Sequence, residues 1–339
     1  KLPANSCIKI LMNKTNIINK KITVYDFDLR QHKRNEGDFF RALEKSVLKR
    51  ITHNNENNNK IFFTLSSGYD SGIISLILNK NNIKINSYTM PCLENIDILA
   101  LRSEYTKKTE NNTFIQLSKD DYLKSKDYIT KNIDNLPVLN NKDQYYHCKD
   151  DWAAYGLHYI FQLAKKNNQK IYLSGHGPDE IYSDYGFNGK VFRGGKLLTD
   201  KKKYEKKMIS TLFGKFPSDL KKIFPWNNFY NGLMKAFISK EEGVGSINGI
   251  ESRYPYLDKM VVQEFLWLNV DNKNKFYKSP LHKYMIKNNY PFDNCKKRGF
   301  KAKRKLQKNN TLLTHGTKSN YLKYKIDIAQ GKLNICNVK

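Results

Sequence analysis

The segment IFFTLSSGYDSG, residues 61–72, joins an apolar run to a turn of small residues and then to a second apolar run at 73–78. This order predicts a buried strand, a tight turn and a helix. Small residues let the backbone of such a turn wrap closely around an anion, because N–H groups at the helix start point toward it. Asp70 would repel a bare phosphate, so its position indicates a divalent cation, Mg²⁺, between them. The alternative is an ordinary Ser/Gly turn in which Asp70 caps the helix.

A second turn of the same kind, LSGHGPDE at residues 173–180, ends another apolar strand at 170–173. Pro178 suits the first position of a helix, and Asp179 and Glu180 suit its positive end, so a capped helix start is again the alternative. If the two strands are neighbours in one sheet, both turns open on the same crevice. Asp70 and Asp179 would then hold one metal ion between them.

Outside these two turns, strands and helices continue to alternate along the chain. Such alternation predicts an α/β fold in which a parallel sheet is covered by helices on both faces and binds ligands at the carboxyl ends of its strands. The first thirty residues instead suggest two strands, too few to bury a core alone, that end a preceding domain or edge the following one. The expected elements are strands at Ser6–Met12, 21–27, 83–90 and 114–117, helices from residue 36, at 98–108 and at 151–166, and a mostly helical region after 187.

Composition limits the class of protein. The chain has 339 residues, of which 39% are hydrophobic and 13% aromatic, enough for a sizeable core and too many for global disorder. No apolar run has membrane-spanning length. The chain opens with Lys1-Leu2-Pro3 and not with a charged and then apolar leader, so we do not expect a signal peptide within it. Five widely spaced cysteines form no C-x-x-C pair, so neither a disulfide framework nor a zinc knuckle is expected, and a cytoplasmic location fits.

The net charge is strongly positive: 60 Lys and Arg residues against 32 Asp and Glu residues give +28. Such a chain attracts polyanions. Lysine is scattered throughout, however, and no basic stripe coincides with an RNA-binding signature, so we do not expect a dedicated nucleic-acid surface.

Motifs that span nearly the whole chain, in the order of the family, resemble those of the asparagine synthetases. Turn 66–71 is similar to the S-G-G-x-D-S pyrophosphate loop of PP-loop ATP pyrophosphatases, and turn 174–180 to the S-G-E-G-x-D-E element of the synthetases. Downstream, GIESRYPYLD at 249–258 resembles G-x-E-x-R-x-P-F-L-D. The segments YKSPLHK at 277–283 and KKRGF at 296–300 resemble the K-x-x-L-R helix and the basic K-x-G-F segment. LPANS at 2–6 is similar to the L-P-P-G turn that follows the glutaminase domain of that family.

The resemblance implies an adenine nucleotide alpha-hydrolase-like (PP-loop) fold with a helical C-terminal part. It also implies a ligase that uses ATP and Mg²⁺ to adenylate aspartate, after which ammonia from a glutaminase domain displaces AMP to give asparagine. Because residue 1 is Lys rather than the expected Cys nucleophile, and Cys7 lies within a strand pattern, that glutaminase domain or subunit is expected upstream. The implied organisation is the end of a preceding domain at 1–34, a synthetase domain at 35–310 and a basic tail at 311–339.

The resemblance also assigns roles to individual residues. Glu251 and Arg253 would form a buried ion pair in the scaffold, with a role for Glu251 as a catalytic base as the alternative. The candidate site consists of Ser66, Ser67, Gly68 and Ser71 on pyrophosphate, Asp70 and Asp179 on Mg²⁺, Leu65, Met90, Ser174 and Gly175 on adenosine, and Lys278, His176 and Glu180 as catalytic residues.

Two departures from the family pattern affect these expectations. Ser67 replaces the first glycine of the loop, which is tolerated if that residue needs no positive φ. His176 replaces the glutamate that the family links to the aspartyl-adenylate and ammonia steps. A histidine can accept a proton near neutral pH, but it does not provide a fixed negative charge toward the ammonium group of aspartate. A carboxylate other than aspartate therefore remains an alternative substrate.

Three alternative functions remain. The same adenylation chemistry could serve another acceptor, as in β-lactam synthetases or macrocycle cyclases. A PP-loop enzyme that modifies tRNA would fit the net charge, but a paired thiol motif is missing and the segment 249–258 argues against it. A non-catalytic binding scaffold would have no reason to retain Asp70, Asp179 and Lys278.

Overall fold

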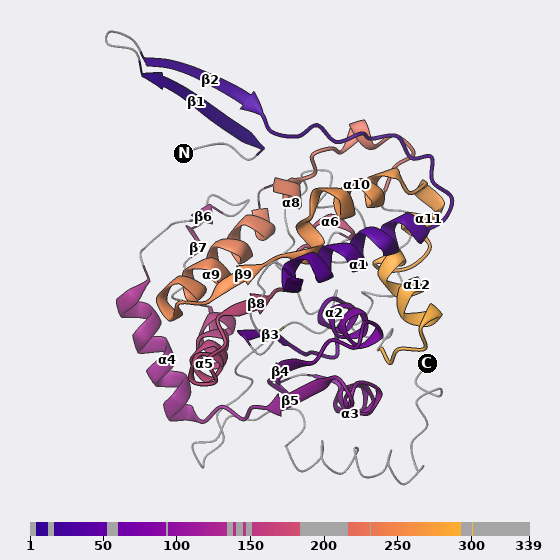
Figure 1. Ribbon diagram of the computed structural model, residues 1–339. Coiled ribbons are helices and arrows are strands. Elements are labelled where there is room, and N and C mark those ends of the chain that lie inside the picture. The colour runs from indigo at the N-terminus through magenta and orange to yellow at the C-terminus, as the bar shows by residue number, and fades with distance from the viewer. Residues whose placement is uncertain are drawn as a thin grey trace.

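A five-stranded parallel sheet forms the centre of the computed structural model (Figure 1). The structure describes residues 5–12, 17–52, 60–92, 94–133, 138–139, 145–146, 151–183, 216–230, 232–292 and 300. The strand order is β5-β4-β3-β8-β9, and all four pairings are parallel. The predicted α/β fold is confirmed, and the two strands that precede the turns, β3 and β8, are direct neighbours. The strands are β3 (Ile61–Thr64), β4 (Ile85–Thr89), β5 (Glu110–Phe114), β8 (Ile171–Leu173) and β9 (Glu251–Arg253).

Helices cover both faces of this sheet, as a parallel sheet requires (Figure 1). One layer contains α1 (Gly37–Thr52), α2 (Tyr69–Lys80), α3 (Ile96–Tyr105), α10 (Lys259–Trp267) and α12 (Ser279–Lys287). The other contains α4 (Lys119–Asn132), α5 (Trp152–Lys166) and α9 (Gly232–Asn248). Shorter elements are α6 (Pro178–Ile181), η3 (Leu220–Lys222), α8 (Asn227–Tyr230), η4 (Pro255–Leu257), α11 (Val270–Asn274), β6 (Val138–Leu139) and β7 (Tyr145–Tyr146).

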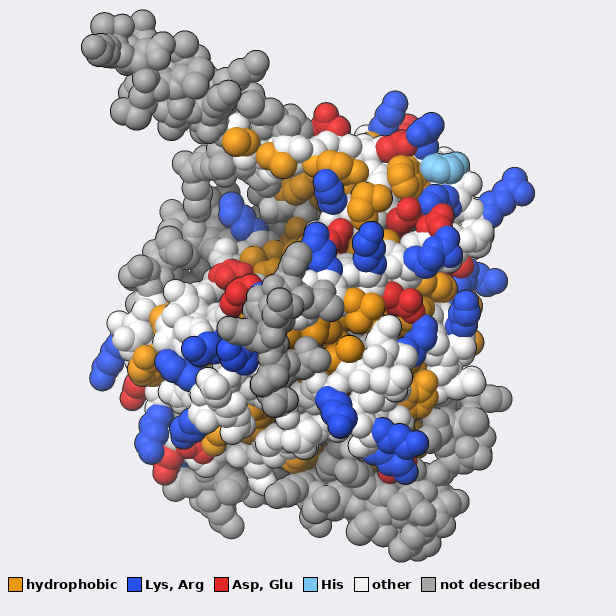
Figure 2. Space-filling model, in the orientation of Figure 1, with side chains coloured by type: hydrophobic (Ala, Val, Ile, Leu, Met, Phe, Trp, Pro, Cys, Tyr) orange, Lys and Arg blue, Asp and Glu red, His pale blue; other side chains and the backbone are white. Residues whose placement is uncertain are grey.

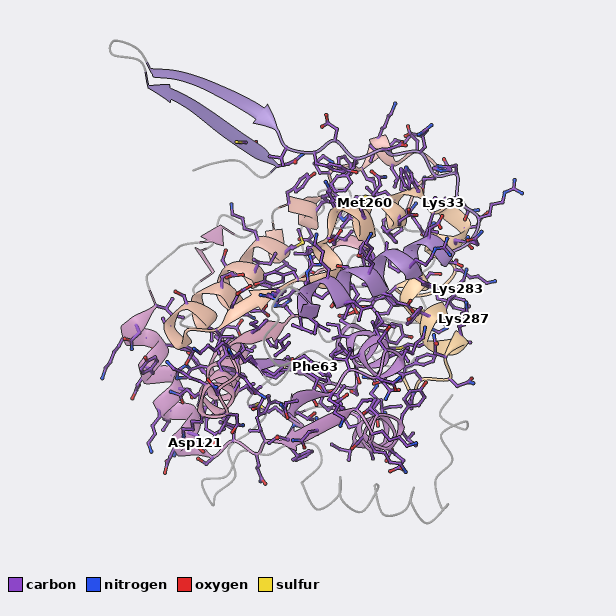
Figure 3. All side chains as sticks on the ribbon, in the orientation of Figure 1. Lys33, Phe63, Asp121, Met260, Lys283 and Lys287 are labelled. Carbon is purple, nitrogen blue, oxygen red and sulfur yellow. The ribbon has the colours of Figure 1, made fainter. Side chains whose placement is uncertain are left out.

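The two layers are fixed by the alternation of side chains along β3. Phe63, labelled in Figure 3, packs into the layer of α1 and α2. Phe62 packs into the layer of α5, and both side chains are fully buried. The ring of Phe62 contacts Phe161 of α5 and Tyr172 of β8 edge-on or tilted, at centroid distances of 5.8 and 5.3 Å. Apolar side chains on both faces of one strand therefore hold the central strand, and with it the following turn, in place.

Three elements of the structure differ from the expectation: one strand lies at another position, and a strand and a helix were not predicted. The third strand lies at Glu110–Phe114 rather than 114–117. It is the polar edge of the sheet, where the half-buried Glu110 accepts hydrogen bonds from Ser75 (2.6 Å) and Ser87 (2.5 Å). Strand β9 interrupts the region after 187 that we expected to be mostly helical. Helix α4 was not expected, although Ser118 and Asp121 form a capping box, a pattern that marks the start of a helix in a sequence.

The N-terminal strands form an antiparallel hairpin that projects from the rest of the molecule (Figure 1). Strand β1 (Ser6–Met12) has the predicted bounds, whereas β2 (Ile17–Thr23) begins and ends four residues earlier than expected. Cys7 is exposed on this hairpin. The following segment is bound to α10: Asp28 and Gln263 exchange two hydrogen bonds, and Lys33 forms an ion pair with Glu264 at 2.6 Å.

Charged side chains of both signs are mixed on the face drawn in Figure 2, with no continuous basic band among its coloured residues. Within the described ranges, no helix is both long enough and apolar enough to cross a membrane. The domain boundary at residue 34 remains a prediction. The segment at 2–4 and the tail at 311–339 lie outside the described residues.

Two buried histidines predict that stability falls in acid. Burial lowers the pKa of His158, which bonds to Asn248, and of His282, which bonds to Tyr69, to about 4 each. Between pH 6.5 and 4 the unfolded chain binds protons that the folded chain does not, so stability decreases as the pH falls. Each histidine should cost roughly 2 kcal/mol between pH 7 and pH 5. Urea unfolding of His158→Gln should show a flatter pH dependence than the wild type; an equal slope in both proteins would contradict this account.

Candidate active site

The two turns meet at the carboxyl end of the sheet. Turn 66–71 follows β3, and turn 174–177 follows the adjacent β8. They are close enough that a Cβ added to Gly175 would lie 3.3 Å from the Cβ of Asp70 and 3.5 Å from the backbone nitrogen of Ser71. The two turns are therefore adjacent, and the crevice expected between them remains a prediction.

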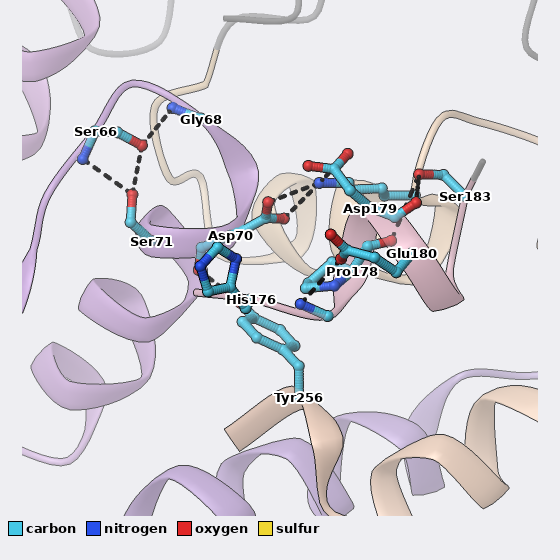
Figure 4. A network of polar contacts seen from close by, with 12 residues as sticks. Ser66, Gly68, Asp70, Ser71, His176, Pro178, Asp179, Glu180, Ser183 and Tyr256 are labelled. Carbon is cyan, nitrogen blue, oxygen red and sulfur yellow. Dashed lines mark hydrogen bonds and ion pairs between the residues drawn. The ribbon is translucent and has the colours of Figure 1, made fainter. Parts of the chain in front are cut away.

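Lys278 lies between the two carboxylates that were assigned to a metal. Its Nζ is 2.7 Å from both oxygens of Asp70 and 2.9 Å from Oδ1 of Asp179. The side chain of Lys278 is only 3% exposed, against 24% for Asp70 and 18% for Asp179. Burial opposes the positive charge, but Asp179 and Asp70 outweigh it and raise the pKa of Lys278 above its ordinary value. Three residues from distant parts of the chain therefore form one charged centre, and Figure 4 shows both carboxylates turned toward the same space.

The backbone of Lys278 is held in an unusual conformation. Its φ of 46° and ψ of 50° place it in the left-handed region, which costs free energy for a residue with a side chain. Lys278 caps the N-terminus of α12, and the preceding Tyr277 donates a hydrogen bond from its hydroxyl to Asp179 Oδ1 at 2.5 Å. The surrounding contacts maintain this strain and aim the ammonium group at the carboxylates.

The first turn collects hydroxyl groups next to the start of α2. Ser66 and Ser71 hydroxyls lie 2.7 Å apart, the Ser66 N–H donates to Ser71 Oγ at 3.0 Å, and the Gly68 N–H donates to Ser66 Oγ at 3.2 Å (Figure 4). Gly68 is the N-cap of α2. The turn thus combines small polar side chains with a helix N-terminus, the chemistry that binds phosphate groups.

Ser67 is bonded to Glu94, a residue that no sequence motif identified. Its N–H donates to Glu94 Oε2 at 2.6 Å, its hydroxyl donates to the same oxygen, and the N–H of Asn95 donates to its Oγ at 3.0 Å. Ser67 does not have a positive φ, as its replacement of glycine requires. Glu94 is 5% exposed and ties this turn to the start of α3. The assignment of Ser67 to the nucleotide stays a prediction, and its observed partner is this carboxylate.

The residues assigned to adenosine lie at the ends of three neighbouring strands. Leu65, Met90 and Ser174 are buried, and each follows the last residue of β3, β4 or β8. The carbonyl of Leu65 accepts a hydrogen bond from Thr89 at 2.9 Å. Ser174 donates its N–H to the carbonyl of Arg253 at 2.9 Å. Their backbone groups thus lie at the carboxyl end of the sheet, where the two turns also lie.

The second turn is shaped by Gly177 and Glu180. Gly177 has a φ of 118°, and a Cβ there would lie 2.6 Å from Leu257, so the turn requires glycine. Glu180 is buried; its carboxylate accepts the N–H of Gly177 at 3.2 Å, and its carbonyl accepts the indole N–H of Trp226 at 2.8 Å. In the structure Glu180 therefore holds the turn that presents Asp179, and its predicted catalytic role remains untested.

His176 forms an ion pair with Glu241 of α9. The distance from Nε2 to Oε2 is 3.0 Å, and the imidazole lies parallel to the ring of Phe237. Burial lowers the pKa of His176, but Glu241 outweighs this effect and the net shift is upward. At a given pH His176 is therefore protonated to a greater extent than a free histidine, so a smaller fraction of it is available to accept a proton. The buried carboxylate of Glu241, on another helix, thus lies beside the position at which the family has a glutamate and this chain has His176.

Glu251 and Arg253 form the predicted ion pair, but the pair is not buried. Arg253 Nε lies 2.7 Å from Glu251 Oε1, but the Glu251 side chain is 61% exposed because β9 is the edge strand. Arg253 also donates to the carbonyl of Arg50, so its role in the scaffold is supported. Of the basic segment 296–300, only the exposed Phe300 is among the described residues.

The donor set suits Mg²⁺. This ion takes hard oxygen ligands and is commonly held by one or two protein carboxylates together with phosphate oxygens. Asp70 and Asp179 supply two carboxylates that converge on one cation, the Lys278 ammonium group. No cluster of three or more metal-ligating side chains occurs in the described part of the chain, so a metal here would complete its coordination with substrate and water.

Comparison with known proteins gives limited similarity. No protein-family model matches this sequence. A curated relative from Methanocaldococcus jannaschii, described as putative asparagine synthetase (glutamine-hydrolyzing) 1, is 21% identical over 238 residues. The match covers 69% of this chain and 36% of the relative, so the chain spans about a third of that protein. The solved structure of the U34-tRNA thiolase NcsA from Methanococcus maripaludis with its 4Fe-4S cluster aligns over 74% of each chain, at 16% identity and a TM-score of 0.29. Similarity this low does not define a common fold.

Proposed function

We propose that this chain is an ATP-dependent ligase that cleaves ATP between its α- and β-phosphates to adenylate a carboxylate, which an amine then converts to an amide. The observation that carries the proposal is the position of Lys278, buried between Asp70 and Asp179 where the two turns meet. The motif order in the sequence and the similarity to a putative asparagine synthetase support aspartate and ammonia as substrates. An upstream glutaminase domain or subunit is part of the proposal.

The proposed mechanism is chiefly one of positioning and charge. The Ser66–Ser71 turn and the N-terminus of α2 would bind the β- and γ-phosphates, and the strand ends at Leu65, Met90 and Ser174 would bind adenosine. Asp70 and Asp179 would hold Mg²⁺, which neutralises phosphate charge when bound. Burial and pairing keep the Lys278 ammonium group charged, so it can stabilise the negative charge that develops as the carboxylate oxygen displaces pyrophosphate.

The experiment that tests this proposal measures product formation from Mg-ATP with a panel of carboxylic acids, each with and without ammonium. We expect aspartate and ammonium to give AMP, pyrophosphate and asparagine in equal amounts. Formation of ADP and phosphate, or ATP cleavage that no carboxylate stimulates, would contradict it. Arg253→Lys, a change on the edge strand rather than in the charged centre, serves as the control for general effects of substitution.

A second candidate keeps the adenylation step and changes the amine. The pair of His176 with the buried Glu241 favours it, because the position that carries a lone carboxylate in asparagine synthetases here carries an ion pair. An enzyme of this kind would use an amine within the substrate, as β-lactam synthetases and macrocycle cyclases do. Amide formation within a carboxylate substrate that carries its own amine, but not from aspartate and ammonium, would identify it.

A further inference from the structure

Arg102 of α3 lies behind the turn that contains Ser66 and Gly68. Its side chain is fully buried. Nη1 donates to the carbonyl oxygen of Ser66 and, at 2.9 Å, to that of Gly68, and Nε donates to the carbonyl of Pro291 at 2.9 Å. One guanidinium group therefore fixes two carbonyls of the turn and joins them to the segment after α12.

The structure makes room for this guanidinium group at a specific place. A Cβ added to Gly72 would lie 2.6 Å from both Cζ and Nη2 of Arg102. The ring of Tyr290 covers the group from another side, with Cζ 5.0 Å from the ring centroid. Gly72 is the last residue of the segment that defines the strand, turn and helix, and its lack of a side chain is explained by the close approach of Arg102.

The direction of the clamped carbonyls determines the direction of the neighbouring N–H groups. In a trans peptide the C=O and N–H bonds point in opposite directions. Because the carbonyl of Gly68 faces Arg102, the N–H of Tyr69, the first residue of α2, faces away from it. N–H groups at a helix start bind anions when they are turned outward in this way.

Arg102 also brings a positive charge beneath the turn. Among the described residues, no carboxylate forms an ion pair with its guanidinium group, and Nη2 has no hydrogen-bond partner. Burial lowers the pKa of Arg102, and the more distant carboxylates of Glu94 and Glu110 oppose this only in part. A buried charge is screened less than an exposed one and therefore acts across the turn on an anion bound at its other side.

We propose that Arg102 is the positioning residue of the anion-binding turn: it holds the carbonyls of Ser66 and Gly68 away from the ligand, turns the N–H of Tyr69 toward it, and supplies part of the attraction for pyrophosphate. This inference rests on the proposed function, because it assigns the polyphosphate of ATP to this turn. Arg102 does not touch the ligand itself and acts through the backbone of the turn.

The test compares the affinities of the wild type, Arg102→Lys and Gly72→Ala for inorganic pyrophosphate, Mg-ATP and adenosine by calorimetry. Lysine keeps the charge but cannot bind both carbonyls and Pro291 in the same geometry, and the added Cβ of Gly72→Ala displaces an unchanged arginine. We expect both variants to bind pyrophosphate and Mg-ATP at least about tenfold more weakly, with adenosine affinity unchanged; tenfold corresponds to about 1.4 kcal/mol. Arg253→Lys changes a partly buried arginine that also donates to a backbone carbonyl; it is the control and should bind all three ligands like the wild type.

The outcomes show whether this inference, the proposed function or both are wrong. Unchanged pyrophosphate affinity in both variants, or an equal loss for adenosine, would overturn the inference and leave the function standing. A wild type that binds pyrophosphate in an Arg102-dependent manner but never cleaves ATP would overturn the function alone. A wild type that binds neither pyrophosphate nor Mg-ATP would overturn both. Thermal unfolding of each variant, measured alongside, confirms that binding is compared between folded proteins.

Discussion

Replacing Lys278 with methionine is expected to lower the rate of carboxylate-dependent ATP cleavage about 100- to 1000-fold, the usual effect of removing a group that stabilises transition-state charge. Lys278 is the cation found between Asp70 and Asp179, and methionine keeps most of its length without its charge. The loss should appear in kcat, because the substitution removes charge from the reacting centre rather than a contact with adenosine.

The matched control for this substitution is Lys283→Met, on the same helix α12. Lys283 forms an ion pair with Glu36 and is more exposed than Lys278, so its loss should change the rate little. The two variants are compared by pyrophosphate release under saturating Mg-ATP. A Lys278→Met enzyme with at least a third of wild-type kcat would show that this lysine is structural.

Asp70→Asn is expected to lower turnover more than about 100-fold, which corresponds to a loss of roughly 3 kcal/mol or more of transition-state stabilisation. Asparagine has nearly the same shape, and the backbone carbonyl of Asp70 can still accept the hydrogen bond of the Tyr256 hydroxyl at 2.6 Å. The turn should therefore keep its conformation while one of the two anionic ligands of the proposed metal is lost.

The measurement is turnover as a function of Mg²⁺ concentration, together with circular dichroism to show that the fold is retained. A higher Mg²⁺ requirement would accompany the lower rate. Asp28→Asn, which removes a carboxylate paired with Arg30 far along the chain from both turns, is the control and should match the wild type. Full activity in Asp70→Asn would remove this residue from the metal site.

Much of the fold was predictable because its signals are local. The apolar run before Ser66 and the one after it define β3 and α2. The single-helix connections from β3 to β4 and from β4 to β5 leave few topologies for this part of a parallel sheet. The edge strands β5 and β9 were misplaced or missed because polar side chains are acceptable at a sheet edge, so the sequence of neither strand shows an apolar run.

The candidate site was predictable only where a motif identifies it. Asp70, Asp179 and Lys278 were each singled out by a local pattern, but their shared contact depends on packing between α2, α6 and α12. Arg102 and Glu241 could not be found in this way. Each belongs to a helix outside the motifs, and its function depends on which turn that helix packs against.

The most direct test of the central claim is carboxylate-dependent exchange of labelled pyrophosphate into ATP, measured without any amine. Reversible formation of an acyl-adenylate at the centre formed by Asp70, Asp179 and Lys278 predicts exchange that requires both Mg²⁺ and a carboxylate and that Lys278→Met loses. Complete absence of exchange across the panel of acids, under conditions in which the protein binds ATP, would contradict the account, and so would exchange of the same rate in Lys278→Met.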